Sequence, residues 1–60
     1  MFYIGKTYKT GEGETHRVLM HNLHGKFPVI TSGPGGVMSK FTRAGQYFEH
    51  KKSEKDLISE

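Results

Sequence analysis

The sequence predicts an all-β fold, a small barrel of five short strands followed by a short C-terminal helical turn. Two observations predict it. Runs rich in aromatic and β-branched residues recur along the chain, and turns that contain glycine or proline separate them. The expected strands cover residues 3–9, 15–22, 27–31, 37–42 and 47–50. Short strands at such intervals are typical of a small barrel.

The second expected strand, THRVLMHN, shows the alternation of a strand with one buried face. Because successive side chains of a strand point to opposite faces, Val18 and Met20 are expected to face the core. Arg17, Leu19 and His21 are expected on the other face. The sequence therefore predicts that the methionine is buried and the arginine is in solvent.

Residues 27–41 are expected to form a hairpin with a glycine-rich tip. Proline cannot donate a hydrogen bond to a β-ladder, so Pro28 belongs at a sheet edge, a strand start or a bulge. The tip, SGPGG, is glycine-rich like a phosphate-binding loop, but a P-loop needs G-x-x-x-x-G-K before a helix. Counting from Gly33, the final Gly-Lys positions hold Met38 and Ser39. The spacing therefore excludes a phosphate loop and favours a plain hairpin tip.

The chain has room for one domain, residues 1–60, without a linker or an internal repeat. Near its end, Ser53 and Asp56 match a capping box, and a helical turn is expected to fold the following Leu-Ile pair onto the open end of the barrel. The rest of residues 51–60 is expected to fray in part. The expected core side chains are Ile4, Tyr8, Val18, Met20, Leu23, Val29, Ile30, Val37, Phe41, Tyr47, Phe48, Leu57 and Ile58.

The composition excludes several classes of site. The chain has no cysteine, so disulfides and thiolate metal sites are excluded. The sequence pairs no nucleophile with a base and no two acids as acid and base, so we expect neither catalytic residues nor a cofactor. No apolar run has the length of a membrane span and no signal-peptide pattern is visible, which predicts a cytoplasmic protein.

Four histidines raise the question of a metal site. On an expected strand, His16 and His21 are predicted to point to opposite faces. His21 and His24 could meet across a turn, and a barrel could add His50. The alternative, histidines scattered over the surface, is favoured, and no metal ligand is assigned.

The net charge of +3 is unevenly distributed along the chain. No acidic residue occurs between Thr15 and Phe48, which predicts one positive region suited to an anionic partner. Tyr47 and Phe48 are neighbours on the fifth expected strand, so one of the two rings must face away from the core. The expected binding residues are Arg17, Lys26, Lys40, Arg43, Tyr47 and Phe48.

Turn and core residues follow one another in a pattern that covers most of the chain: Y-x-T-x-x-G-x-x-x-R-V-L, then G-x-x-P-V, T-x-x-G-x-Y and S-x-x-D-L. The residues in this pattern are Tyr8, Thr10, Gly13, Arg17, Val18, Leu19, Gly25, Pro28, Val29, Thr42, Gly45, Tyr47, Ser53, Asp56 and Leu57. The pattern resembles a group of small proteins encoded by bacteriophages and prophages. The loop at 32–36 departs from that group, whose members tend to carry more acidic residues there. The resemblance implies a phage origin and an SH3-like or similar small barrel, without an assigned activity.

These features predict a non-catalytic binding module. The favoured interpretation is a phage-encoded accessory protein in the host cytoplasm that binds a host or phage protein through its positive face and modulates it. One alternative is DNA or RNA binding by the same face, with cations on phosphates and rings under bases. Another is a homo-oligomeric structural component that associates through an open barrel edge near Pro28. No membrane partner is expected.

Overall fold

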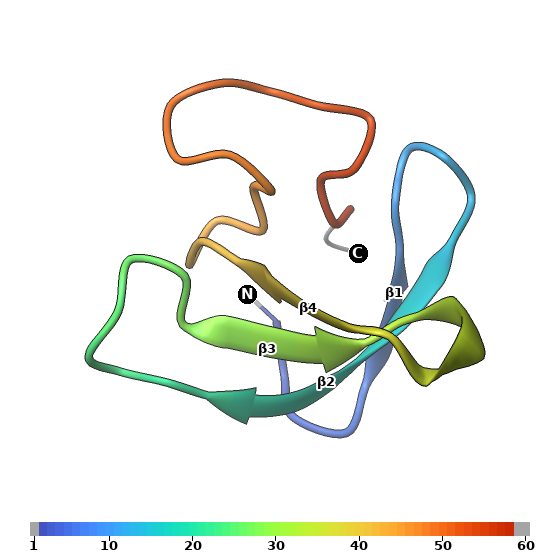
Figure 1. The fold of residues 1–60 in the computed structure, drawn as a ribbon, viewed down its shortest axis with the longest axis horizontal. Helices are drawn as coiled ribbons and strands as arrows, with labels where there is room; N and C mark the ends of the chain where they lie inside the picture. Colours follow the sequence, from blue (N-terminus) through green and yellow to red (C-terminus); the bar gives the residue numbers. More distant parts are fainter. Residues whose placement is uncertain (1, 59–60) are drawn as a thin grey trace.

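The computed structural model describes residues 2–58 and contains one antiparallel sheet of four strands (Figure 1). The all-β prediction is confirmed. The strands lie side by side in the order of the sequence, and one 3-10 turn connects the last two. These elements are β1 (Thr7–Lys9), β2 (Thr15–His21), β3 (Val29–Ser32), η1 (Pro34–Gly36) and β4 (Met38–Phe41). No helix within residues 2–58 is long and apolar enough to cross a membrane.

The predicted fifth strand over 47–50 is not formed, and the five-stranded barrel is not confirmed. Phe48 makes only an isolated bridge with Lys51. The backbone N–H of Tyr47 donates to the carboxylate of Asp56 at 2.8 Å, so a side chain takes the place of a neighbouring strand. After β4 the chain instead forms turns that pass over the sheet and return beside β1 (Figure 1, orange to red).

A β-bulge in β2 changes which side chains of that strand face the core. Val18 pairs with Thr31 and Met20 pairs with Ile30, so Leu19 is an extra residue between consecutive pairs. Because side chains alternate along a strand, the extra residue reverses the alternation after it. Met20, predicted to lie in the core, is 52% exposed. The prediction for this side chain is wrong because of the bulge.

The same bulge turns His21 toward the core. His21 pairs with Val29, which is buried, and residues directly opposite each other in an antiparallel pair share a face. Its Nε2 donates a hydrogen bond to the carbonyl oxygen of Phe2 at 2.8 Å. His16, earlier on the strand, is also buried on the inner face. The prediction that these two histidines point to opposite faces is wrong.

Pro28 lies directly before β3, which agrees with the strand-start alternative. Its carbonyl oxygen accepts a hydrogen bond from the N–H of Asn22 at 2.7 Å. Since β3 lies between β2 and β4, the sheet has no edge near Pro28. The alternative that placed an open edge there is wrong, because the two edge strands are β1 and β4.

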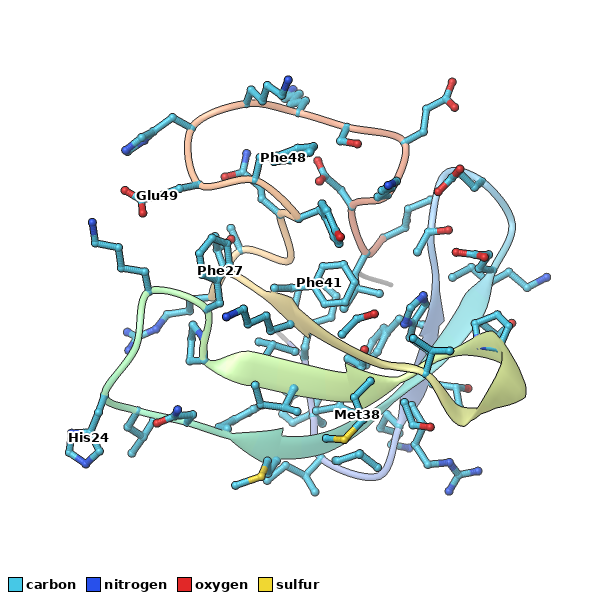
Figure 2. All side chains as sticks on the ribbon, viewed as in Figure 1. His24, Phe27, Met38, Phe41, Phe48 and Glu49 are labelled. Carbon is cyan, nitrogen blue, oxygen red and sulfur yellow. The ribbon has the colours of Figure 1, made fainter. Side chains whose placement is uncertain are left out.

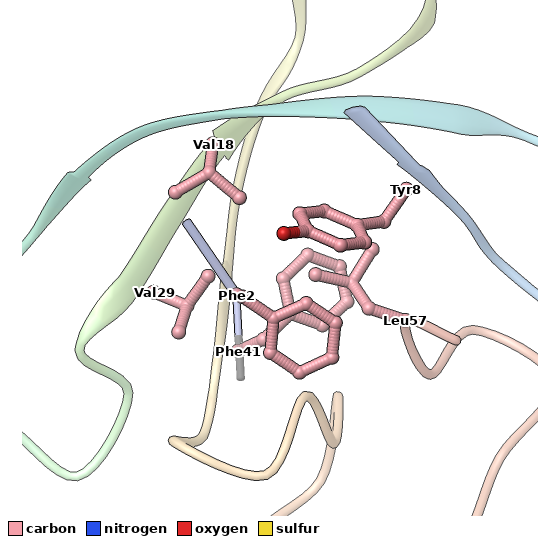
Figure 3. Close-up of a cluster of buried hydrophobic side chains, with 6 residues drawn as sticks. All are labelled: Phe2, Tyr8, Val18, Val29, Phe41 and Leu57. Carbon is pink, nitrogen blue, oxygen red and sulfur yellow. The ribbon is translucent and has the colours of Figure 1, made fainter. Parts of the chain in front are cut away.

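The core is a single cluster on the inner face of the sheet (Figure 3). Phe2 and Tyr8 pack edge to face with ring centroids 4.8 Å apart. Phe2 was not predicted, because it precedes the first expected strand. Tyr47 packs partly buried against the cluster. The buried apolar side chains are Phe2, Tyr8, Val18, Val29, Phe41 and Leu57.

Six predicted core side chains are exposed instead. Apart from Met20, each lies outside the four strands, where no sheet directs its side chain inward. Ile30 is half-buried. It pairs with Met20, so both side chains lie on the face of the sheet away from the core. The exposed side chains are Ile4, Met20, Leu23, Val37, Phe48 and Ile58.

The C-terminal segment, residues 42–58, joins the end of β4 to β1. The N–H of Leu57 donates to the carbonyl oxygen of Gly45 at 2.8 Å, and the N–H of Ile58 donates to that of Lys9 at 2.9 Å. These contacts fall in the stretch for which the sequence predicts fraying, of which residues 59 and 60 lie outside the described range. The C-terminal segment therefore covers the core, closes on itself through Leu57 and Gly45, and hydrogen-bonds to the β1 edge of the sheet.

The predicted capping box is present, but the expected helical turn is a single hydrogen-bonded turn. The N–H of Ser53 donates to the Asp56 carboxylate at 3.0 Å, and the N–H of Lys55 donates to the Ser53 hydroxyl at 3.1 Å. The N–H of Asp56 donates to the carbonyl oxygen of Ser53 at 3.0 Å. The capping interactions therefore stabilise a turn that places Leu57 in the core.

A comparison of two glycines tests the packing of Phe2. Gly45 and Gly13 have nearly the same φ, +86° and +87°, so alanine costs about 1 kcal/mol of backbone strain at either position. A Cβ at Gly45 would also lie 2.5 Å from the Phe2 ring, whereas nothing lies within 4 Å of one at Gly13. Gly45→Ala should therefore lower the free energy of unfolding by about 1–3 kcal/mol more than Gly13→Ala. Urea denaturation measures the difference, and equal losses would contradict the packing.

Candidate functional site

The outer face of the sheet, the side away from the core, carries exposed side chains from β2 and β4. Its cross-strand rows are set by the register of β2, β3 and β4. Arg17 lies opposite Ser32, which lies opposite Met38. The next row contains Met20, Ile30 and Lys40. With the bulge residue, the outer face consists of Arg17, Leu19, Met20, Ile30, Ser32, Met38 and Lys40.

Apolar side chains lie at the centre of the outer face. Leu19 is 41% exposed, Met20 is 52% exposed and Met38 is 63% exposed, while Ile30 between the strands is half-buried. No segment of residues 2–58 packs over them, because the C-terminal segment lies on the inner side, with Tyr47 against the core. Several exposed apolar side chains on one face of a small protein are typical of a contact surface for another molecule.

The charges on the outer face are all positive. Arg17 and Lys40 belong to its rows, and Lys9 lies on the same side of β1, because its neighbour Tyr8 faces the core. None of the four strands contains an aspartate or a glutamate. The Lys40 Nζ lies 5.8 Å from the centroid of the Phe27 ring. The outer face is therefore apolar at its centre and cationic around it.

The structure divides the predicted positive region into two parts. Lys26, Lys40 and Arg43 lie around the loop that precedes β3: Lys40 contacts Phe27, and Arg43 lines a hollow beside Pro28. Lys26 also pairs with Glu49 across 3.5 Å, which partly offsets its charge. Arg17 lies opposite the last residue of β3, Ser32, at the other end of that strand. Arg17 and Lys40 thus share the outer face on different strands and rows, while Lys26 and Arg43 lie outside its rows.

Of the adjacent aromatic pair, Phe48 is the ring that faces outward. Tyr47 is half-buried, with its ring centroid 5.9 Å from that of Phe41, and Phe48 is 41% exposed. The Lys51 Nζ lies 4.7 Å from the Phe48 ring centroid. Figure 2 shows Phe48 on the C-terminal segment, well apart from Met38 on the sheet. Phe48 is therefore not brought together with the outer face.

The buried His16 side chain is held by a hydrogen bond and by packing within the fold. Its Nδ1 lies 3.0 Å from the hydroxyl of Thr31, and its ring packs edge to face on Phe41 with centroids 5.5 Å apart. A Cβ at Gly33 would lie 2.6 Å from the ring, so the glycine allows the hairpin tip to approach it. His16 Nε2 is also 3.9 Å from a carboxylate oxygen of Glu14. The histidine fixes the hairpin tip against the core.

The other histidines lie apart from His16. His24 is exposed in the loop after β2, and His50 pairs with Glu49 at 2.7 Å. Within residues 2–58, no three histidine or acidic side chains are placed to hold a metal ion. The arrangement of the histidines therefore follows from local packing and ion pairs.

Several hollows lie beside the sheet. One, of about 340 Å³, is lined by Thr7, Tyr8, Lys9, Thr15 and Ile58. Another, of about 230 Å³, is mostly apolar and is lined by Phe2, His21, Leu23, Pro28, Val29 and Arg43. A third, of about 260 Å³, lies between β4, the C-terminal segment and the loop after β1. It is lined by Glu12, Glu14, His16, Ser39, Phe41, Tyr47 and Lys55.

Comparison with known proteins gives no assignment. The chain matches no protein-family model, and no curated protein or solved structure gives a significant match. The residues of the structure therefore carry the functional argument.

Sequence reasoning placed Arg17 and Leu19 on the face away from the core and named Lys40 as a binding residue, but it missed Met20 as part of the same surface. A signal for Met20 is present in the run Val18-Leu19-Met20. Strict alternation can bury only the first and third of three consecutive apolar residues, so such a run also fits a bulge that exposes two of them.

The Asp56 carboxylate is predicted to hold the C-terminal segment in place. Asp56→Ala removes the acceptor of two part-buried N–H groups, those of Tyr47 and Ser53, and should lower the free energy of unfolding by about 1–3 kcal/mol. It should also speed amide hydrogen exchange at Tyr47. Glu54→Ala, which removes an exposed side chain from the same turn, is the control. Equal exchange at Tyr47 in both variants would contradict this role.

Proposed function

We propose that the chain is a non-catalytic binding module that contacts another protein through the outer face of its sheet. The observation that carries the proposal is the exposure of Leu19, Met20 and Met38 on one face of the sheet, around the half-buried Ile30 and with cations but no acids in the strands. An apolar centre within a polar rim is the usual arrangement of a protein interface. Methionine adapts its shape readily, which suits it to contact surfaces.

The proposed context is a phage-encoded accessory protein that binds a host or phage protein in the host cytoplasm and modulates it. The sequence pattern shared with small phage proteins supports the origin. The positive outer face supports an acidic partner surface, because opposite charges favour encounter and correct orientation. At 60 residues, one exposed sheet face is a large part of the molecule, and a standard interface uses about 800 Å² from each partner.

We further propose that the fold is an SH3-like small barrel that is not completely closed. Support comes from the C-terminal segment, which follows β4 directly and hydrogen-bonds to Lys9 at the β1 edge. An isolated bridge between Thr10 and Leu57 adds to this closure. A turn-rich segment thus occupies the place of a fifth strand.

The second candidate function is DNA or RNA binding, which the cations Lys9, Arg17 and Lys40 favour. Against it, the one exposed ring of the predicted pair, Phe48, lies on the C-terminal segment rather than among these cations. Bases need an exposed ring to stack on, so this arrangement favours a protein partner.

Affinity capture with two matched variants tests the proposal. Met20→Glu places a charge at the centre of the outer face, whereas Leu23→Glu places one on a loop residue that is 74% exposed. We expect a nuclease-treated bacterial lysate to yield a protein that the wild type and Leu23→Glu retain and that Met20→Glu loses. Circular dichroism checks that both variants fold.

Two outcomes would contradict protein binding by the outer face. One is a captured protein that both variants retain equally. The other is capture that disappears with nuclease treatment, together with a mobility shift of DNA or RNA that weakens steeply with salt, which would favour the second candidate.

A further inference from the structure

The outer edge of β4 presents backbone groups that the sheet does not use. The N–H of Gly33 donates to the carbonyl oxygen of Val37 at 2.8 Å, which makes this pair a hydrogen-bonded one. Hydrogen-bonded and non-hydrogen-bonded pairs alternate along an antiparallel ladder. Ser39, opposite Thr31, therefore bonds to β3, whereas the N–H and C=O of Met38 and Lys40 point away from it.

The C-terminal segment does not cover this edge. Among residues 2–58, its backbone hydrogen bonds to the rest of the chain go to Lys9, Glu12 and the turn after β4, and none goes to Met38 or Lys40. At the opposite edge of the sheet, by contrast, the N–H of Ile58 bonds to the carbonyl oxygen of Lys9. The edge of β4 is thus the side on which the small barrel stays open.

A hollow lies directly beside the open edge. The 260 Å³ hollow is bounded by Ser39 and Phe41 from β4 and by Tyr47 and Lys55 from the C-terminal segment. Side chains of a strand added to β4 would alternate between this hollow and the outer face, because successive side chains point to opposite sides. Backbone hydrogen bonds and alternate side-chain contacts are the two components of recognition by strand addition.

We propose that β4 is a docking edge for an extended segment of the partner protein, which adds to the sheet as its fifth strand. The proposal rests on the protein-binding function above and names the form of the partner. Residues opposite Met38 and Lys40 would lie on the outer face, two positions apart, and the residue between them would enter the hollow. Charge complementarity with Lys40, on a face without acids, selects an acidic residue opposite it and an apolar residue opposite Met38.

A second copy of the chain fits this edge less well. If two β4 strands paired antiparallel about Ser39, each Lys40 would lie opposite Met38 of the other copy and would gain no acidic partner. A lysine at a sheet edge also discourages pairing between identical chains. The charge of the edge therefore favours an acidic partner segment over self-association.

Amide hydrogen exchange followed by NMR tests the docking edge on the intact chain. In the free protein the amides of Met38 and Lys40 should exchange fast, while those of Ser39 and Phe41 should be protected. The probe is the capped heptapeptide TVTETVT, and its matched control is TVTKTVT. We expect the acidic peptide to slow exchange at Met38 and Lys40 and to bind about tenfold more tightly than the control.

Two variants separate the backbone contact from the charge. Lys40→Pro removes an outward N–H without a loss of bonding to β3, and Lys40→Thr removes the charge alone. Lys40→Pro should lower the affinity for the acidic peptide about tenfold more than Lys40→Thr does. If the proline variant does not fold, exchange in the wild type decides.

Three results would overturn the proposal: slow exchange at Met38 and Lys40 in the dilute free chain, protection that increases with protein concentration alone, or no added protection with the acidic peptide. Each of these results would leave the proposed function intact if the wild type still captures a protein that Met20→Glu does not capture. Failure of that capture together with intact peptide binding would instead refute contact through the outer face.

Discussion

One extra residue in β2 determines which face of this small sheet is buried and which is left exposed. Leu19 interrupts the pairing between Val18 and Met20, so the strand turns His21 toward the core and Met20 toward solvent. Without the bulge, the methionine would fill the core beside Val18. With it, the apolar residues of β2 are shared between the two faces, and the outer face receives the side chains that we assign to binding.

The inner face is completed by the chain ends rather than by another strand. Phe2 from one end and Leu57 from the other meet Tyr8 in the core. The Asp56 carboxylate holds the turn that delivers Leu57, and none of the backbone hydrogen bonds of the C-terminal segment within the described residues goes to Met38 or Lys40 at the edge of β4. Turns and side chains, in place of a fifth strand, close the core. The outer face of the sheet and the edge of β4 stay open.

The sequence predicted the all-β class and four of the strands, because alternation and glycine turns are local signals. It could not predict the absence of the fifth strand, since the backbone of Tyr47 bonds to the side chain of Asp56 nine residues later instead of to another strand. It also placed Met20 in the core, because a bulge has no strict local signature. Of the candidate site, Lys40 and Arg17 were expected to be outward, whereas their separation on the surface follows only from the register.

The measurement that tests this account most directly is the solvent exposure of methyl groups by NMR with a soluble gadolinium chelate. If the bulge forms, the Met20 and Met38 methyl signals should broaden strongly and to a similar extent, while those of Val18 and Val29 should be little affected. A Met20 methyl as protected as those of Val18 would mean that β2 alternates without interruption. The outer face would then lack its central side chain, and the account would be contradicted.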